Sequence, residues 1–173
     1  RRQRQMCIRD SCHGGPGEDG TLQAMLDMAG VAYTGPNLPG AALGMDKLAS
    51  SAVARAAGLE CLERELLVAG QDPGFPGPYI LKPRYGGSSI GIDVVADPAA
   101  AQARLGANPH LSRGAVVEPY RADLFDLQIA VMTFPKPQLS AIERPLRGTS
   151  QNEILSYRDK YVACLLYTSD AAD

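Results

Sequence analysis

The sequence predicts a mixed α/β chain, with an α+β sheet domain after residue 60. One observation is a glycine-rich loop followed by apolar residues at helical spacing, which is typical of an amphipathic helix. Another is a pair of alanine-rich runs, each preceded by an aspartate that suits a helix N-cap. The third is a set of short β-branched runs bounded by glycine and proline, at residues 79–82, 91–95 and 115–118.

Composition excludes several classes of function. The 173 residues are 45% hydrophobic, which is enough for the core of one domain or two small ones. A net charge of −2 and only 6% aromatic residues give no basis for nucleic-acid binding. No apolar run approaches the roughly 20 residues of a membrane span, and no signal peptide is visible. We therefore expect a cytoplasmic protein that binds neither nucleic acid nor membrane.

The cysteines and histidines predict no metal centre of their own. The four cysteines have no CxxC spacing, which favours neither a zinc site nor a disulfide framework and fits a reducing cytoplasm. With only His13 and His110, an all-histidine metal site is not expected.

The two ends differ in character from the middle. Residues 1–11 read RRQRQMCIRDS, and the last residues read CLLYTSDAAD. Both resemble translated sequencing-adapter DNA, so we expect residues 1–11 and 163–173 to be artefactual tails. The alternative for the start is a basic arm that binds an acidic partner.

The first helix is expected to run from Glu18 to Ala29. Its apolar face would hold Leu22, Met25 and Leu26, and both Met25 and Met28 are expected in the core. The acidic residues at its start suit the helix dipole, and Gly30 can end it. A brief strand is predicted at residues 31–34.

A second helix is predicted from Asp46 as N-cap to Gly58. Lys47 is electrostatically unfavourable in the first turn, which either indicates a nearby anion or is the mark of a solvated side chain. After a loop at residues 70–78 come the β-branched runs, a helix from Pro98 capped by Asp97, and strands at residues 126–133 and 138–142.

The chain is organised around residues 79–91, which read YILKPRYGGSSIG. A strand ends at Lys82, and Gly86 and Gly87 let the backbone bend sharply and approach a ligand. Turn amides with the Ser88 and Ser89 hydroxyls can form an anion-binding nest beside the lysine. The stretch indicates either a phosphate-binding loop or a glycine-rich hairpin with an incidental lysine.

Several motifs occur in order along the chain: HGGPGEDG, YTGP, MDK, YILKPRYGGSSIG, VVEPY and YRDKY. In this combination the chain resembles the D-alanine–D-alanine ligases of the ATP-grasp superfamily over about residues 13–161. The resemblance implies a partial ATP-grasp fold. Residues 12–44 would end the N-terminal α/β domain, residues 45–122 would be the central domain, and residues 123–162 would begin the C-terminal domain.

The resemblance also implies an activity. The family uses ATP and Mg²⁺ to form an acyl phosphate on one D-alanine, which the amine of a second D-alanine attacks. The product is D-alanyl-D-alanine for peptidoglycan, the bacterial cell-wall polymer. The complete protein would accordingly be a cytoplasmic ligase and a homodimer acting on small molecules.

The family's site residues are carried over by motif. The ATP-binding residues would be Lys47, Lys82, Gly86, Gly87, Ser88, Ser89, Glu118, Pro119, Tyr120, Arg121, Asp126 and Lys160. Within this set the lysines and the loop would hold phosphates, Glu118 would receive the adenine amino group, and Asp126 would bind ribose. The residues beside the substrate would be Ser88, Tyr161, His13 and Glu18.

The sequence departs from the family in two places. Residues 122–126 read ADLFD, where the family has a G-x-E turn before its ribose carboxylate, and Arg158 replaces an acidic residue. These departures leave open an ATP-grasp ligase for another amino acid or peptide, or an ATP-binding remnant without catalysis. A P-loop hydrolase and a protein kinase are excluded, because both place the glycine loop before the lysine.

The resemblance further implies that this chain is a fragment. The family's magnesium ligands would lie beyond residue 173, so no metal ligand is expected here. The glutamate that holds the first substrate amine would lie before residue 12. We therefore expect no ligase activity from the chain as written.

Overall fold

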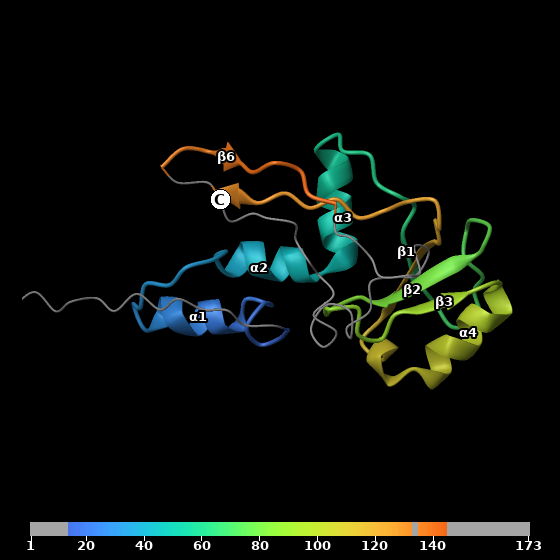
Figure 1. The fold of residues 1–173 in the computed structure, drawn as a ribbon. Helices are drawn as coiled ribbons and strands as arrows, with labels where there is room; N and C mark the ends of the chain where they lie inside the picture. The colour runs from blue at the N-terminus through green and yellow to red at the C-terminus, as the bar shows by residue number, and fades with distance from the viewer. Residues whose placement is uncertain (1–13, 133–134, 145–173) are drawn as a thin grey trace, which may run out of the picture. The chain divides into compact units, whose positions relative to one another are not determined.

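The structure, a computed structural model, describes residues 14–132 and 135–144 (Figure 1). The chain divides into two compact units, Arg1–Tyr120 and Arg121–Asp173, and each is described by itself. The described part of the first unit holds helices α1 to α4 and a four-stranded sheet, and that of the second holds a two-stranded sheet.

Three helices open the first unit: α1 (Thr21–Met28), α2 (Leu38–Met45) and α3 (Lys47–Ala56). Helix α3 begins where the sequence predicts, because the Asp46 carboxylate accepts hydrogen bonds from the amides of Leu48 (3.0 Å) and Ala49 (3.3 Å). Helix α1 ends as predicted, with Gly30 in the left-handed region at a φ of 66° just past the last turn.

The sheet of the first unit has the strand order β1-β4-β2-β3, and every pair is antiparallel. Its strands are β1 (Glu65–Leu67), β2 (Tyr79–Pro83), β3 (Asp93–Val95) and β4 (Ala115–Pro119). The register of the two central strands places Ile80 opposite Glu118 and Lys82 opposite Val116. Strand β3 lies within its predicted run, and β2 and β4 each extend one residue past theirs, so this part of the prediction is confirmed.

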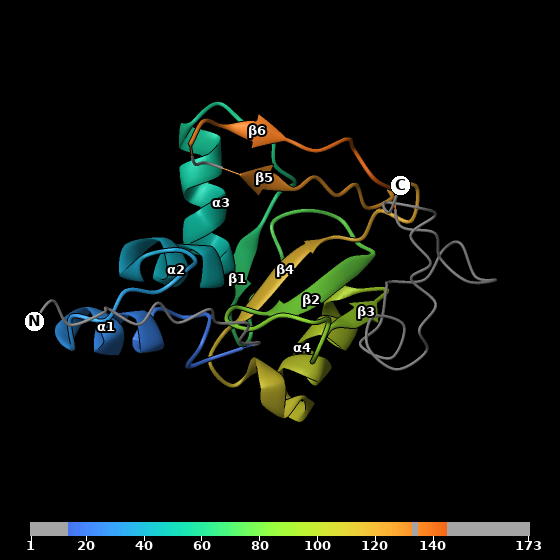
Figure 2. The same ribbon diagram turned by 60° about the vertical axis from the view of Figure 1, so that its left-hand side comes forward.

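Alternation along β2 and β4 separates the core from the polar residues. Tyr79, Leu81 and Val117 lie in one buried cluster with Ala101 of α4 (Pro98–Ala107), which lies beside β3 (Figure 2). Because side chains alternate between the faces of a strand, Lys82 and Glu118 share the opposite face. The same alternation that builds the core therefore presents a lysine and a carboxylate together on the other side.

Some sequence predictions are wrong. Residues 31–34 form no strand, and only Tyr33 makes an isolated bridge. Helix α1 begins at Thr21 rather than Glu18, since the two acidic residues lie in the preceding turn, where Asp19 accepts a hydrogen bond from the Thr21 amide (3.0 Å). In both places the residues form local turns instead of the strand or helix that the sequence pattern predicted.

The buried face of α1 also differs from the prediction. Met25 and Met28 are 64% and 91% exposed, whereas Gln23 is 6% exposed. The helix contacts α2 through the side that holds Gln23, and hydrophobic spacing alone does not show which side a neighbour covers.

The sequence prediction missed helix α2, strand β1 and the short 3-10 helix Pro109–Leu111. Helix α2 begins with Asn37 as N-cap, whose side chain accepts a hydrogen bond from the Gly40 amide (3.1 Å). Strand β1 pairs with β4, and its short ELL segment has too little alternation to identify.

The second unit contains β5 (Val131–Met132) and β6 (Gln138–Leu139), which pair antiparallel, with a further bridge between Gln128 and Glu143. These strands are shorter than predicted. Across the residues that the structure describes, none of the helices combines the length and apolarity that a membrane crossing requires.

Candidate functional site

The glycine-serine segment joins β2 to β3 and is the turn of a β-hairpin. Its backbone is unusual, since Ser88 and Ser89 both have positive φ, at 55° and 59°. Non-glycine residues seldom adopt this conformation, and two in succession indicate a backbone held by its surroundings. The segment is thus a hairpin, as one alternative predicted, and its turn geometry is compatible with the phosphate loop that the other alternative predicted.

Lys82 and Glu118 form an ion pair on the polar face of the sheet. Lys82 Nζ lies 2.7 Å from Glu118 Oε2, and only 3% of the Glu118 side chain is exposed. A carboxylate this deeply buried requires compensating positive charge. The pair places a lysine beside the start of the hairpin turn.

Arg64 supplies a second positive charge to the same carboxylate. Its Nε lies 2.7 Å from Glu118 Oε1, and the two groups form an ion pair. Arg64 Nη1 donates a hydrogen bond to the Lys47 carbonyl (2.7 Å). Arg64 therefore links strand β4 to the first turn of α3.

Lys47 brings a third cation to the turn. Its Nζ donates a hydrogen bond to the Gly86 carbonyl (2.7 Å). Desolvation, followed by repulsion from Lys82 and Arg64, lowers the pKa of Lys47 below its ordinary value. We call Lys47, Arg64 and Lys82 the cationic cluster; a ligand with several negative charges would relieve their mutual repulsion.

Asp46 and Arg84 fix α3 against the hairpin. Arg84 Nε and Nη2 donate to Asp46 Oδ1 (2.9 Å) and Oδ2 (2.6 Å), and the Lys47 amide donates to the Arg84 carbonyl (3.2 Å). The Arg84 guanidinium, with two amides at the helix start, lowers the pKa of Asp46 to about 2. This forked pair sets the position of Lys47 relative to the turn.

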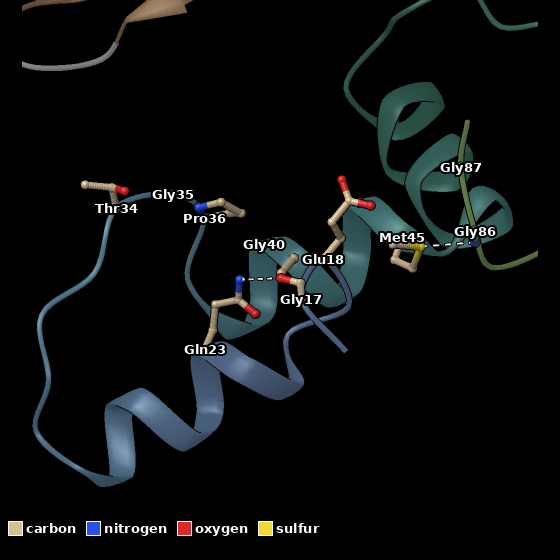
Figure 3. A pocket seen from close by; sticks show the side chains of 12 residues that line it. Gly17, Glu18, Gln23, Thr34, Gly35, Pro36, Gly40, Met45, Gly86 and Gly87 are labelled. Carbon is tan, nitrogen blue, oxygen red and sulfur yellow. Dashed lines mark hydrogen bonds between the residues drawn. The ribbon is translucent and has the colours of Figure 1, made fainter. Parts of the chain in front are cut away.

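A pocket of about 430 Å³ lies between the glycine-rich loop, α2 and the hairpin turn (Figure 3). Glu18 lines it together with Gly86 and Gly87. Gln23 Nε2 donates to the Gly17 carbonyl (2.9 Å) and so ties α1 to the loop that carries Glu18. The Met45 sulfur accepts from the Gly86 amide (3.1 Å), which joins α2 to the turn.

The structure brings several of the predicted site residues together. Lys47, Lys82, Gly86 and Glu118 are joined by the contacts above, and Glu18 shares the pocket with the turn glycines. Beyond Glu118, the chain continues through Pro119 to Tyr120, whose amide donates to the Pro78 carbonyl (2.8 Å).

The remaining predicted residues are not placed relative to this group. Arg121 and Asp126 belong to the second unit, where Arg121 pairs with Asp123 (2.8 and 2.6 Å). His13, Lys160 and Tyr161 lie outside the described residues. No three histidine, cysteine, aspartate or glutamate side chains in the described ranges gather into a group that could hold a metal ion.

Two polar residues of this region were missed by sequence reasoning. Gln23 gave a weak signal, as a polar residue within an amphipathic helix. Arg64 gave no signal, because it lies in a charged stretch that is typical of a solvated surface. The residues that it contacts are also distant from it in the sequence.

No family model matches the chain. The D-alanine–D-alanine ligase of Campylobacter concisus is 33% identical over 152 residues, which cover 87% of this chain and 43% of that protein. The ligase of the same name from Caulobacter sp. is 38% identical over 132 residues, covering 72% of this chain and 40% of that protein. The chain thus spans less than half the length of these relatives.

Solved structures of D-alanine–D-alanine ligases also match the chain. The D-alanine–D-alanine ligase of Helicobacter pylori has a TM-score of 0.71 and 25% identity, covering 83% of this chain and 48% of that one. The ligase of Bacillus anthracis complexed with ATP has a TM-score of 0.58 and 26% identity, covering 80% and 53%. The resemblance to D-alanine–D-alanine ligases and the partial ATP-grasp fold are both confirmed.

Proposed function

We propose that this chain is the nucleotide-binding portion of a D-alanine–D-alanine ligase and that Lys47, Lys82 and the hairpin turn bind the phosphates of ATP. The observation that carries the proposal is that two lysines from separate elements lie near enough to repel each other: Lys47 of α3, which binds the turn at Gly86, and Lys82 of β2, which precedes the turn. ATP carries about four negative charges, and phosphoryl transfer requires positive charge placed in advance. The ATP complex of the Bacillus anthracis relative supports the choice of nucleotide.

The proposed reaction has two steps. A carboxylate oxygen of the first D-alanine attacks the γ-phosphorus, so that ADP leaves and an acyl phosphate forms. The amine of the second D-alanine then attacks the carbonyl carbon, loses a proton, and phosphate leaves.

This chain's own residues would bind and position the reactants. Lys47 and Lys82 would hold phosphate oxygens, and the carboxylate of Glu118 would accept the adenine amino N–H. The turn at Gly86 to Ser89 would cover the phosphates and exclude water, which otherwise hydrolyses an acyl phosphate. Ser88 would also orient the substrate side of the site, next to the pocket that Glu18 lines.

Magnesium would neutralise charge on the transferred phosphate when bound, but the described residues do not fit it. They contain no group of ligands that could hold a metal, and each oxygen of Glu118 already contacts a cation. We therefore assign no metal ligand in this part of the chain. We further propose that the complete protein is a cytoplasmic homodimer that serves peptidoglycan synthesis, with D-alanine as its substrate.

The proposal predicts that Lys82→Ala weakens binding of the ATP analogue AMP-PNP at least about tenfold, since a charge-assisted contact to phosphate is lost. Isothermal titration calorimetry of the 173-residue chain and the variant measures this. Arg104→Ala is the charge-matched control, because Arg104 lies on α4, which packs against the core side of the sheet; its affinity should stay within about twofold. Equal affinity of wild type and Lys82→Ala would refute the phosphate site.

A further inference from the structure

Arg64 occupies a bridging position within the site. Its Nε faces Glu118 Oε1 at 2.7 Å, and its Nη1 donates to the Lys47 carbonyl at 2.7 Å. One guanidinium thus contacts both the carboxylate on β4 and the backbone of α3. Its side chain is largely buried, at 23% exposed, so these contacts are not a chance arrangement of a surface arginine.

The two cations beside Glu118 differ in how they are held. Lys82 contacts the carboxylate with a single flexible ammonium. Arg64 has a planar guanidinium with a second anchor on the helix backbone. If Lys82 turns to the phosphates of a nucleotide, Arg64 remains as the positive charge beside the buried carboxylate.

Glu118 has one oxygen for each neighbour. Oε1 lies against Arg64 and Oε2 against Lys82. When Lys82 moves, Oε2 becomes the acceptor available to a ligand N–H, while Oε1 stays tied. Oε1 therefore keeps its contact with Arg64, whereas Oε2 can exchange its contact with Lys82 for one with a ligand.

We propose that Arg64 is a positioning residue for the nucleotide base: it holds Glu118 by Oε1 so that Oε2 can accept the base N–H while Lys82 moves to the phosphates. This rests on the proposed function, which assigns the base to Glu118. Arg64 acts through Glu118, because two of its three guanidinium nitrogens are already directed to protein groups.

The test compares a ligand with a base and one without. Calorimetry on the full 173-residue chain measures AMP-PNP and inorganic tripolyphosphate binding to the wild type, Arg64→Met, Arg64→Lys, Glu118→Gln and the Arg64→Met/Glu118→Gln double variant. Arg64→Met should weaken AMP-PNP about tenfold and tripolyphosphate by less than about threefold, since only the first ligand uses Glu118. Arg64→Lys should recover part of the AMP-PNP affinity, because it restores the charge beside Oε1 but not the rigid link to α3.

The double variant tests whether Arg64 works through Glu118. In the Glu118→Gln background, Arg64→Met should cause less than about a twofold further change in AMP-PNP affinity. Additive losses would overturn the proposal, because Arg64 would then act independently of the carboxylate. Equal losses for AMP-PNP and tripolyphosphate would also overturn it, since they would indicate direct contact with phosphate or a general field effect.

The remaining outcomes distinguish a failure of the Arg64 proposal from a failure of the proposed nucleotide-binding function. If Lys82→Ala weakens AMP-PNP and Arg64→Met does not, the role of Arg64 is refuted and the nucleotide site stands. If the wild type binds no AMP-PNP, or if Lys82→Ala binds it equally well, the proposed function fails. Circular dichroism and thermal melting check folding, and if Arg64→Met and Arg64→Lys both unfold, Arg64 is structural and the inference is lost.

Discussion

Asp46 shows how one residue serves both a local and a tertiary purpose. As N-cap, it accepts hydrogen bonds from the amides of Leu48 and Ala49. The same carboxylate also binds the guanidinium of Arg84. The first role can be predicted from the position of Asp46 ahead of an alanine-rich run. The second could not, because three elements, α3, β1 and β2, separate Arg84 from Asp46 in the sequence.

Asp46→Asn tests the tertiary role, because asparagine is an equally good N-cap but carries no charge. The pKa of Asp46 is lowered from 3.8 to about 2, so its ionised form stabilises the fold above pH 4, and this contribution is lost as the pH falls from about 4 to 2. The variant should lose about 2 kcal/mol of unfolding free energy at pH 7, and most of this difference should be gone by pH 2. Urea denaturation across this pH range measures it.

Asp123→Asn is the control for this prediction. Asp123 also pairs with an arginine, Arg121, but both side chains are exposed and solvent screens their attraction. Little change in stability is expected. A difference between wild type and Asp46→Asn that stays constant down to pH 2 would contradict the charge-based account.

At the scale of elements, the hairpin turn is constrained by contact with another element of the fold. Gly91 closes it with a φ of 73°, and a Cβ there would lie 2.4 Å from the Cβ of His110. His110 belongs to the short 3-10 turn Pro109–Leu111, so the hairpin and this turn are in close contact. The spacing of glycines in the sequence predicts a sharp bend, whereas the contact with His110 is visible only in the fold.

Gly91→Ala should therefore lower the free energy of unfolding by about 3 kcal/mol, from the left-handed backbone and the steric clash together. Gly106→Ala is the matched substitution. Gly106 lies in α4 with nothing within 4 Å of an added Cβ, so alanine should raise stability by up to about 1 kcal/mol. Denaturant titration of both variants measures the contrast, and equal effects would show that Gly91 is not constrained as described.

At the scale of the whole molecule, the chain corresponds to only part of its ligase relatives, 43% of the Campylobacter concisus protein for example. We predict that the 173-residue chain binds nucleotide but forms no ADP when D-alanine is added, since the resemblance places the magnesium ligands outside it. A coupled ADP assay measures this, and the D-alanine–D-alanine ligase of Campylobacter concisus is the positive control. ADP formation that depends on D-alanine from this chain alone would contradict the prediction.

Local pattern accounts for much of what could be predicted. The caps at Asp46 and Asp97, the helix end at Gly30 and the strands of the central hairpin depend on nearest neighbours in sequence, so they are readable from it. The glycine-serine turn with its lysine was predictable for the same reason. The order of such segments along the chain also sufficed for the family resemblance.

Only the tertiary structure decided which charges meet. Antiparallel pairing of β2 with β4 puts Lys82 and Glu118 on one face, and the path of the chain into β1 brings Arg64 to the same carboxylate. The burial of Gln23 in place of Met25 was decided in the same way, by which neighbour covers α1. Sequence by itself determined the local elements and the kind of site, because these depend on adjacent residues. The arrangement of cations around one buried carboxylate depends on packing between distant segments, and so only the fold could determine it.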